Sequence, residues 1–322
     1  MLGLSRTIIA VLFWIAAAQA ADSSNFDPWL VGLRAEAIAM GVDVEILDAA
    51  LTGIRPIARI IELDRRQPEG RLTAAQYLER VVPTSRQTVA KQRLSKHRKL
   101  LKFIAAKYGV QPRFIVALWG IETDFGRNTG GFGVIEALAT LAYDGRRANF
   151  FRSELLAALQ ILDERHIAPD AMRGSWAGAM GQSQFMPSSF LAYAVDENDD
   201  GRRDIWKTLP DVFASIANYL TQFGWEDNQT WGRAVRLPTG FDKNLIGLET
   251  KRPIGGWQVL GVRRQDGRDL PTRQLPASIV QPDGEGTQAY MVYGNFATTL
   301  KWNRSTYFAL AVGKLADSMI GH

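Results

Sequence analysis

An apolar helical stripe that contains one glutamate constrains this chain more than any other feature. The stretch covers residues 111–126 and reads QPRFIVALWGIETDFG. Pro112 suits the first turn of a helix, because its missing N–H would have no partner there. The residues that share one helical face with Glu122 are Phe114, Leu118, Ile121 and Phe125. The pattern predicts a mostly buried helix that ends near Gly126 and carries one acid among apolar neighbours.

A carboxyl group in this position is expected to have a raised pKa. Burial disfavours the charged form, so the pKa of a glutamate moves from ~4.3 towards ~6–7. Such a group can hold a proton near neutral pH and donate it. The alternative is a half-solvated Glu122 at a helix end, or one paired with an arginine, and this stretch alone leaves both open.

The N-terminus has the pattern of a secretory signal. Arg6 precedes an apolar run from Ile8 to Ala18, and residues 18–20 read Ala-Gln-Ala, a small-x-small cleavage site. The run is short for a membrane span. We therefore expect residues 1–20 to be cleaved and the protein to act in the periplasm without a stable membrane anchor; a retained anchor is the alternative.

Composition excludes several classes of protein. The 322 residues are 46% hydrophobic and 22% charged, which is typical of a globular chain. The absence of cysteine excludes disulfides, thiol nucleophiles, thiolate metal sites and a lipidated cysteine. A formal net charge of +5 is too small for a nucleic-acid footprint. We expect no nucleic-acid partner.

Helical patterns dominate, with one β-rich segment. Long helices are predicted over 86–108 and 298–315, and strands over 235–237, 257–263 and 289–293, where alternating or β-branched runs are broken by Gly and Pro. The fold class is α+β, mainly helical. After the signal, the expected units are an N-terminal helical domain (21–108), a core (109–229), a small β-rich domain (230–294) and a C-terminal helix that packs back on the core (295–322).

Two further stretches carry groups suited to ligand binding. Residues 174–189, GSWAGAMGQSQFMPSS, place hydrogen-bonding and stacking side chains among small residues, including Ser175, Gln184 and Phe185. This favours a wall that binds sugar, although a tightly packed turn is the alternative. Arg146 and Arg147 could hold a substrate carboxylate bidentately, or form a surface pair without a ligand.

An acidic loop follows at 196–211, DENDDGRRDIWKTLPD. Its oxygen-bearing side chains have EF-hand spacing, with Gly201 at position six: Asp196, Asn198, Asp200 and Asp204. Position twelve is Lys207 instead of Glu, so a late Asp211 would have to supply the closing carboxylate. We expect a structural calcium ion; an empty acidic loop is the alternative.

Together these motifs resemble a known family. WGIETDFG, GSWAGAMGQSQFMPSS, DENDDGRRDIW, SIANYL and LKWNRSTYFALAV, in this order, are similar to the membrane-bound lytic murein transglycosylase B family, over about residues 27–315. The resemblance implies a lysozyme-like core and cleavage of peptidoglycan glycan strands. We expect a monomer without a catalytic cofactor, with other cell-wall enzymes as further partners.

The resemblance also implies roles for individual residues. Glu122 would be the single catalytic acid/base. The implied substrate-binding residues are Arg146, Arg147, Ser175, Gln184, Phe185, Tyr219 and Trp302. The implied calcium ligands are Asp196, Asn198, Asp200, the backbone of Arg202, and Asp211. Some relatives have Tyr where this chain has Trp302, which leaves the role of that side chain open.

The residues are consistent with a single-acid reaction. Most glycosidases use two carboxylates, ~5–5.5 Å apart when retaining and ~6.5–9.5 Å apart when inverting. Asp124, Glu136 and Asp144 lack a setting that suits them as a second one. The resemblance implies that the C6 hydroxyl of the muramic acid ring acts as nucleophile and gives a 1,6-anhydro product. A hydrolytic muramidase, or a non-catalytic calcium-stabilised glycan-binding protein, is the alternative.

Overall fold

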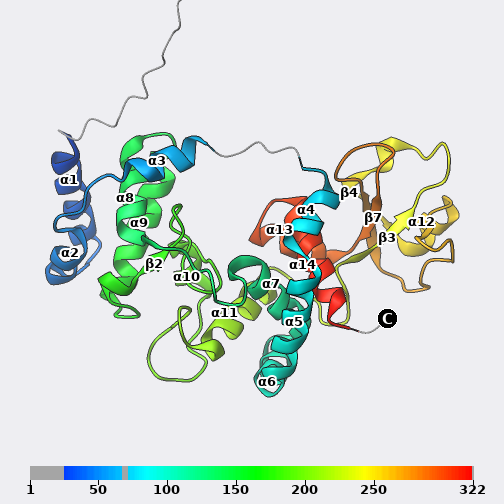
Figure 1. Ribbon diagram of the computed structural model, residues 1–322, viewed down its shortest axis with the longest axis horizontal. Helices are drawn as coiled ribbons and strands as arrows, with labels where there is room; N and C mark the ends of the chain where they lie inside the picture. Colours follow the sequence, from blue (N-terminus) through cyan, green and yellow to red (C-terminus); the bar gives the residue numbers. More distant parts are fainter. Residues whose placement is uncertain (1–24, 67–71, 321–322) are drawn as a thin grey trace, which may run out of the picture.

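The computed structural model describes residues 25–66 and 72–320, and these form an elongated molecule with helices at one end and a small sheet at the other (Figure 1). The predicted signal at 1–20 lies outside the described residues. The mainly helical α+β class is confirmed. Among residues 25–66 and 72–320, no helix combines the length and the apolar character that crossing a membrane requires.

The first hydrophobic core lies at the helical end. It is formed by α1 (Phe26–Ala39), α2 (Val44–Leu51), α3 (Ala58–Arg65), α8 (Val134–Asp144), α9 (Ala148–Asp163) and α10 (Pro187–Tyr193). Asp43 caps α2 by accepting a hydrogen bond from the Glu45 backbone N–H, as its position before an apolar run suggests. Buried Leu33 of α1 and Leu138 of α8 belong to the same cluster, so helices distant in sequence share one interior.

The second core lies in the middle of the molecule. Its helices are α4 (Ala74–Val81), α5 (Thr84–Lys96), α6 (Arg98–Tyr108), α7 (Pro112–Thr123), α11 (Leu209–Gln222), α13 (Gly294–Trp302) and α14 (Thr306–Ser318). A capping box between Thr73 and Gln76 starts α4. Helices from the expected N-terminal unit, 21–108, therefore contribute to both cores.

A five-stranded antiparallel sheet forms the other end, in the order β4-β6-β7-β3-β5. Its strands are β3 (Gly232–Arg236), β4 (Gly247–Pro253), β5 (Arg263–Arg264), β6 (Pro276–Val280) and β7 (Ala289–Val292). Along β7, Tyr290 and Val292 face the second core, whereas Ala289 and Met291 face α12 (Ile254–Val259), because side chains alternate between the faces of a strand. Both faces of the sheet are thus covered. A two-stranded ladder joins β1 (Phe132–Gly133) and β2 (Arg173–Gly174).

Three predictions of local structure were wrong in detail. Residues 257–259 form part of α12 instead of a strand, because Ile254 and Trp257, three residues apart, bury the same side of one helical turn. The long helix over 86–108 is interrupted at His97, where the backbone leaves helical geometry. The C-terminal helix is two helices, separated by an extended Asn303.

Candidate active site

Helix α7 holds Glu122 in its last turn. Phe114 and Leu118 are fully buried, and α7 packs against α5, α6, α11 and α14. Gly120 permits this close packing: a Cβ there would lie 2.6 Å from the Phe125 ring and 3.2 Å from the Leu315 side chain. The helix that presents the acid is therefore fixed on several sides.

The turn after Glu122 is strained. Asp124 and Phe125 have φ values of 52° and 62°, in the left-handed region that residues with a Cβ rarely adopt. Ion pairs from the Asp124 carboxylate, 3.5 Å to Arg86 and 2.6 Å to Arg127, help to hold this conformation. The helix ends at Thr123, before Gly126, and the stabilised turn fixes where the Glu122 side chain emerges.

Glu122 is partly buried, and among the described residues its side chain accepts a hydrogen bond from a distant indole. The indole Nε1 of Trp302, at the end of α13, donates to the Glu122 Oε1 atom over 2.7 Å. Burial raises the pKa of Glu122 to about 7, and the Trp302 hydrogen bond opposes this rise because it favours the carboxylate. The predicted elevation of the pKa is confirmed. At neutral pH the group is divided between its acid and base forms.

Three aromatic rings form a wall beside this carboxyl. The Trp302 ring centroid lies 5.2 Å from that of Phe185 and 4.8 Å from that of Tyr219. The Tyr219 hydroxyl donates to the Lys301 carbonyl over 2.7 Å, which ties α11 to the last turn of α13. Trp302 packs against both hydrophobic cores, so the wall lies at their junction.

The small-residue stretch at 174–189 folds back beneath α7. Ser175 Oγ accepts hydrogen bonds from the backbone N–H groups of Ala177 and Ala179, and thereby shapes its own turn. Gln184, with a φ of 50°, donates from Nε2 to the carbonyls of Thr129 and Gly181. Ser175 and Gln184 therefore form hydrogen bonds within the protein. A tightly packed turn, the alternative to a sugar-binding wall for this stretch, would show the same bonds.

The arginine pair already has a carboxylate partner in the chain. Arg146 donates from Nε and Nη2 to the two carboxylate oxygens of Asp64, 2.5 Å each, and Arg147 adds a third contact of 3.1 Å. The Asp64 side chain is 1% exposed, whereas those of Arg146 and Arg147 are 48% and 43% exposed. The hydrogen bond from Arg146 lowers the pKa of Asp64 despite its burial. The pair therefore anchors α3, and each guanidinium keeps an outward side.

The acidic loop turns its oxygens onto its own backbone. Asp196 accepts from the N–H groups of Asp200 and Gly201, and Asp200 accepts from that of Arg202. Asp211, which is fully buried, accepts from the N–H groups of residues 197 and 204. Burial raises its pKa, with smaller contributions from the charges of Asp196 and Asp200. The predicted ligand side chains are thus near one another, although the described residues contain no cluster of three acids or histidines with metal-binding geometry.

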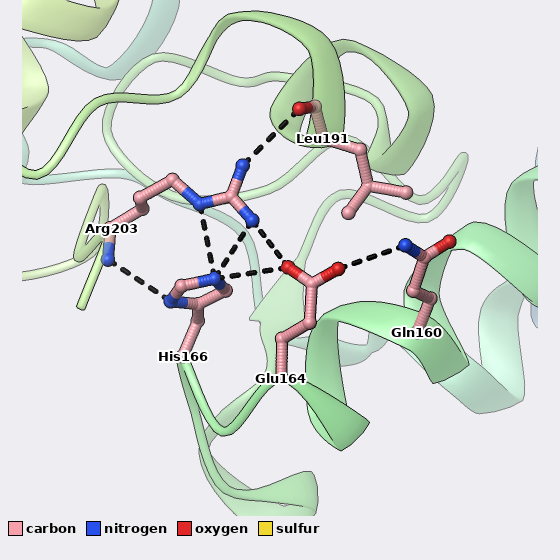
Figure 2. A network of polar contacts seen from close by, with 5 residues as sticks. All are labelled: Gln160, Glu164, His166, Leu191 and Arg203. Atoms are coloured by element: carbon pink, nitrogen blue, oxygen red, sulfur yellow. Dashed lines mark hydrogen bonds and ion pairs between the residues drawn. The ribbon is translucent and has the colours of Figure 1, made fainter. Parts of the chain in front are cut away.

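A polar network fixes the base of this loop to the end of α9 (Figure 2). His166 accepts at Nδ1 from the Arg203 backbone N–H over 3.1 Å, and its Nε2 lies 3.1 Å from a Glu164 carboxylate oxygen. The Arg203 guanidinium also contacts Glu164 and donates to the Leu191 carbonyl. Burial, followed by the Arg203 charge, lowers the pKa of His166. The neutral ring is a structural hydrogen-bonding hub.

The Transglycosylase SLT domain family matches residues 25–317 of this sequence. The chain belongs to this family. It is 35% identical over 225 residues to membrane-bound lytic murein transglycosylase B of Escherichia coli (strain K12), a match that covers 66% of this chain and 58% of that protein. The chain thus matches less than two thirds of that relative's length. The family resemblance stated from the motifs is confirmed.

Solved structures of relatives share the fold. SltB3 from Pseudomonas aeruginosa in complex with NAG-NAM-pentapeptide has a TM-score of 0.90 and 43% identity, covering 92% of this chain and 80% of that one. SltB1 from the same organism has a TM-score of 0.80 and 30% identity, covering 91% and 98%. Escherichia coli Slt35 in complex with calcium has a TM-score of 0.76 and 29% identity, covering 93% of both chains.

The structure adds one residue to the neighbourhood of Glu122, Tyr77, and gives a structural role to Gln182 of the 174–189 stretch. Burial and then the charge of Glu122 raise the pKa of Tyr77, which brings a phenol from α4 to the catalytic candidate. Gln182 joins α7 to the 174–189 stretch, accepting from Trp119 Nε1 at 2.7 Å and from Thr123 Oγ1 at 3.0 Å through its backbone carbonyl. Gln182 belongs to the 174–189 stretch, whose polar side chains among small residues indicated a binding wall. Nothing in the sequence around Tyr77 indicated that it would lie near Glu122.

Proposed function

We propose that this protein is a lytic transglycosylase that cleaves the β-1,4 bond between MurNAc and GlcNAc in peptidoglycan and leaves a 1,6-anhydro-MurNAc end. The observation that carries the proposal is Glu122, a partly buried carboxyl of raised pKa, oriented by the Trp302 indole beside an aromatic wall. Family membership and the glycan-peptide ligand of the SltB3 structure support the substrate class.

Glu122 acts in both halves of the reaction. In its protonated form it donates a proton to the glycosidic oxygen as the bond from that oxygen to C1 of MurNAc breaks. The resulting carboxylate then accepts the proton of the C6 hydroxyl as its oxygen bonds to C1. Glu122 recovers its starting form and no water is consumed. A pKa of about 7 suits a group that must give and then take a proton near neutrality.

The surroundings of Glu122 favour this route over hydrolysis by two carboxylates. Asp124 is held by Arg86 and Arg127, and Asp144 by Arg65. No other acid among the described residues contributes to the pKa of Glu122, as a carboxylate at glycosidase distance would. The substrate hydroxyl is therefore the nucleophile that remains.

The aromatic wall supplies binding surface for the sugars. Trp302 is partly exposed and offers a ring face of the kind on which pyranose rings pack, whereas Phe185 and Tyr219 are only 3% and 8% exposed and back the Trp302 ring. Ser175 and Gln184 lie on the adjoining stretch. Arg146 and Arg147 keep exposed N–H groups for a substrate carboxylate after binding Asp64. These residues remain the proposed substrate contacts.

Product analysis tests the proposed activity. Purified sacculi are digested with the protein, and the released muropeptides are examined by mass spectrometry. The proposal expects terminal sugars lighter by one water than those that a hydrolytic muramidase releases, and Glu122→Gln should release none. Products of hydrolytic mass would instead establish the muramidase alternative. Binding without any cleavage by the unaltered protein would support the glycan-binding alternative.

A structural calcium ion is part of the proposal. The oxygen-only donor set of Asp196, Asn198, Asp200, the Arg202 carbonyl and Asp211 is of the type calcium prefers. The raised pKa of buried Asp211, caused by burial and then by nearby carboxylates, is a cost that a divalent cation would remove. These residues would hold the ion and brace the loop next to α11, with no part in the chemistry. The calcium complex of Slt35 supports the assignment.

The proposed setting is the periplasm, reached through a cleaved signal at 1–20, with the protein acting as a monomer. Other cell-wall enzymes remain proposed partners. Mass spectrometry of the N-terminus of the exported protein tests the cleavage, and an intact Met1 would contradict it.

A further inference from the structure

A cavity of about 660 Å³ lies between the small sheet and α13. Leu248 of β4, Ala277 of β6 and Val292 of β7 line its sheet side, and Leu300 lines its helix side. This volume is within the usual range for ligand sites, about 300–1,000 Å³. It is separate from the groups assigned to the glycan above.

The end of α13 and the extended residues after it connect this cavity with Glu122. Lys301 and Arg304 line the cavity, and Trp302 between them donates to Glu122. The Lys301 carbonyl also accepts the Tyr219 hydroxyl of the aromatic wall. Because consecutive residues of a chain are ~3.8 Å apart, a substituent on a sugar bound at the wall could reach the cavity.

The cavity carries charges that have no partner. Lys251, Lys301 and Arg304 provide three cations around it, and Glu249 provides one acid. All four are exposed, and none forms an ion pair with another residue of the described ranges. By contrast, Arg86, Arg146 and Arg147 are all paired with aspartates. The unpaired charges of the cavity are available to a ligand.

We propose that this cavity binds the peptide that peptidoglycan carries on its muramic acid, with Lys251 and Arg304 holding peptide carboxylates and Glu249 holding a side-chain ammonium group. The inference rests on the proposed function. In intact strands the lactyl carboxyl of muramic acid is joined to the peptide as an amide, so the sugars carry no net charge, and a charged recess beside the glycan wall suits the peptide portion of the substrate. The apolar side chains of the sheet would contact the peptide's small aliphatic side chains.

The test compares peptide-bearing strands with strands that have lost their peptides and carry the freed lactyl carboxylate of muramic acid instead. Glycan strands with intact stem peptides are assayed beside the same strands stripped by an amidase, and 1,6-anhydro ends are counted. The double variant Lys251→Gln, Arg304→Gln should lower kcat/KM on peptide-bearing strands, relative to stripped strands, by about tenfold, mainly through KM. A tenfold change corresponds to about 1.4 kcal/mol.

A matched double variant controls for general attraction to the anionic wall. Lys99→Gln, Lys102→Gln also removes two exposed positive charges, on α6 away from the cavity. It should leave the ratio between the two substrates as in the unaltered protein. The peptide site would be overturned if both double variants lowered the ratio of kcat/KM on peptide-bearing to stripped strands equally. It would also be overturned if Lys251→Gln, Arg304→Gln left this ratio unchanged.

A charge reversal tests the acidic side of the cavity. Glu249→Lys should weaken cleavage of strands whose peptides have a free side-chain amine, and acetylation of that amine should remove the difference from the unaltered protein. The same penalty on acetylated and free strands would contradict the role of Glu249. Failure of the proposed function would look different, because the unaltered protein would then form no 1,6-anhydro ends on either substrate.

Discussion

The indole N–H of Trp302 donates to the Glu122 carboxyl over 2.7 Å, linking the C-terminal end of α13 to the last turn of α7 across 180 residues of sequence. The bond favours the carboxylate, while burial favours the protonated acid, and burial has the larger effect. The two influences together leave a group that can both donate and accept a proton near neutral pH.

Trp302→Phe removes the donor and keeps an aromatic ring. Without the hydrogen bond the pKa of Glu122 should rise further, so the alkaline limb of the pH profile of kcat/KM should move to higher pH. We expect kcat to fall by about tenfold as well, because the carboxyl loses its orientation. The measurement is the pH dependence of 1,6-anhydro product formation.

Trp206→Phe is the matched control, since the Trp206 indole donates to the Arg173 carbonyl instead of to the catalytic candidate. The alkaline limb of its pH profile should lie at the same pH as in the unaltered protein. An unmoved profile in Trp302→Phe would show that the indole does not influence the titration of Glu122.

Glu122→Gln removes the titrating group and preserves its approximate shape. The rate of product formation should fall by at least ~10²–10⁴-fold, because an amide cannot protonate the glycosidic oxygen. Binding to insoluble sacculi should persist, as measured by co-sedimentation. Lytic activity near that of the unaltered protein would refute the assignment of Glu122.

The activity and the stability of the protein should both decrease as the pH rises through about 7. Glu122 is protonated in the folded state up to a pKa of about 7, whereas its ordinary pKa is 4.5. Between these values the folded state binds more protons, so the contribution to the free energy of unfolding is full below pH 4.5 and is lost by about pH 7. Glu122→Gln should lack this contribution and be more stable than the unaltered protein at pH 8, by about 2 kcal/mol.

Urea denaturation at pH 5 and pH 8 measures the difference. Because Glu122 is partly accessible to solvent, the expected stability difference between Glu122→Gln and the unaltered protein is an upper bound. An equal decrease in stability from pH 5 to pH 8 in Glu122→Gln and in the unaltered protein would assign the pH dependence to other groups.

The sequence predicted the helix that presents Glu122 because apolar periodicity and Pro112 are local signals. It did not predict the arrangement of groups that come from distant segments. The carboxylate for Arg146 and Arg147 is Asp64, which is 82 residues away from Arg146 and has no local pattern that marks it. Tyr77 reaches the site only because α4 packs against α14.

Short apolar runs were the other source of error. Ile254 to Arg263 contains both an alternating pattern and an i, i+3 pair, and such a run does not distinguish a strand from one helical turn. Burial of Trp257 beneath the sheet, with its Nε1 donating to the Ala277 carbonyl, decides for the helix. This contact is tertiary, so it has no counterpart in the sequence pattern.

Asp64→Asn should destabilise the protein by about 2 kcal/mol, because a buried carboxylate that accepts from two guanidinium groups is lost. The pKa of Asp64 is lowered in the folded state, first by the Arg146 hydrogen bond, so this stability is present above its ordinary pKa of 3.8 and is lost as the pH falls below it. Denaturant unfolding at pH 7 and pH 3 checks both statements. Arg59→Gln, which breaks an exposed pair with Glu62, should change the stability much less, because water screens the pair.

Calcium should raise the melting temperature of protein that has first been treated with a chelator. Filling the proposed site at about one hundred times its dissociation constant would add about 2.7 kcal/mol, which is several degrees for a chain of this size. Asp200→Asn should weaken this response, because Asp200 is a proposed ligand. Asp199→Asn is the matched control: Asp199 lies in the same loop, is exposed and is not a proposed ligand, and asparagine tolerates its φ of 56°. If calcium leaves the melting temperature unchanged, or if both variants respond like the unaltered protein, the acidic loop is held by the hydrogen bonds to its own backbone and the Arg203 network alone.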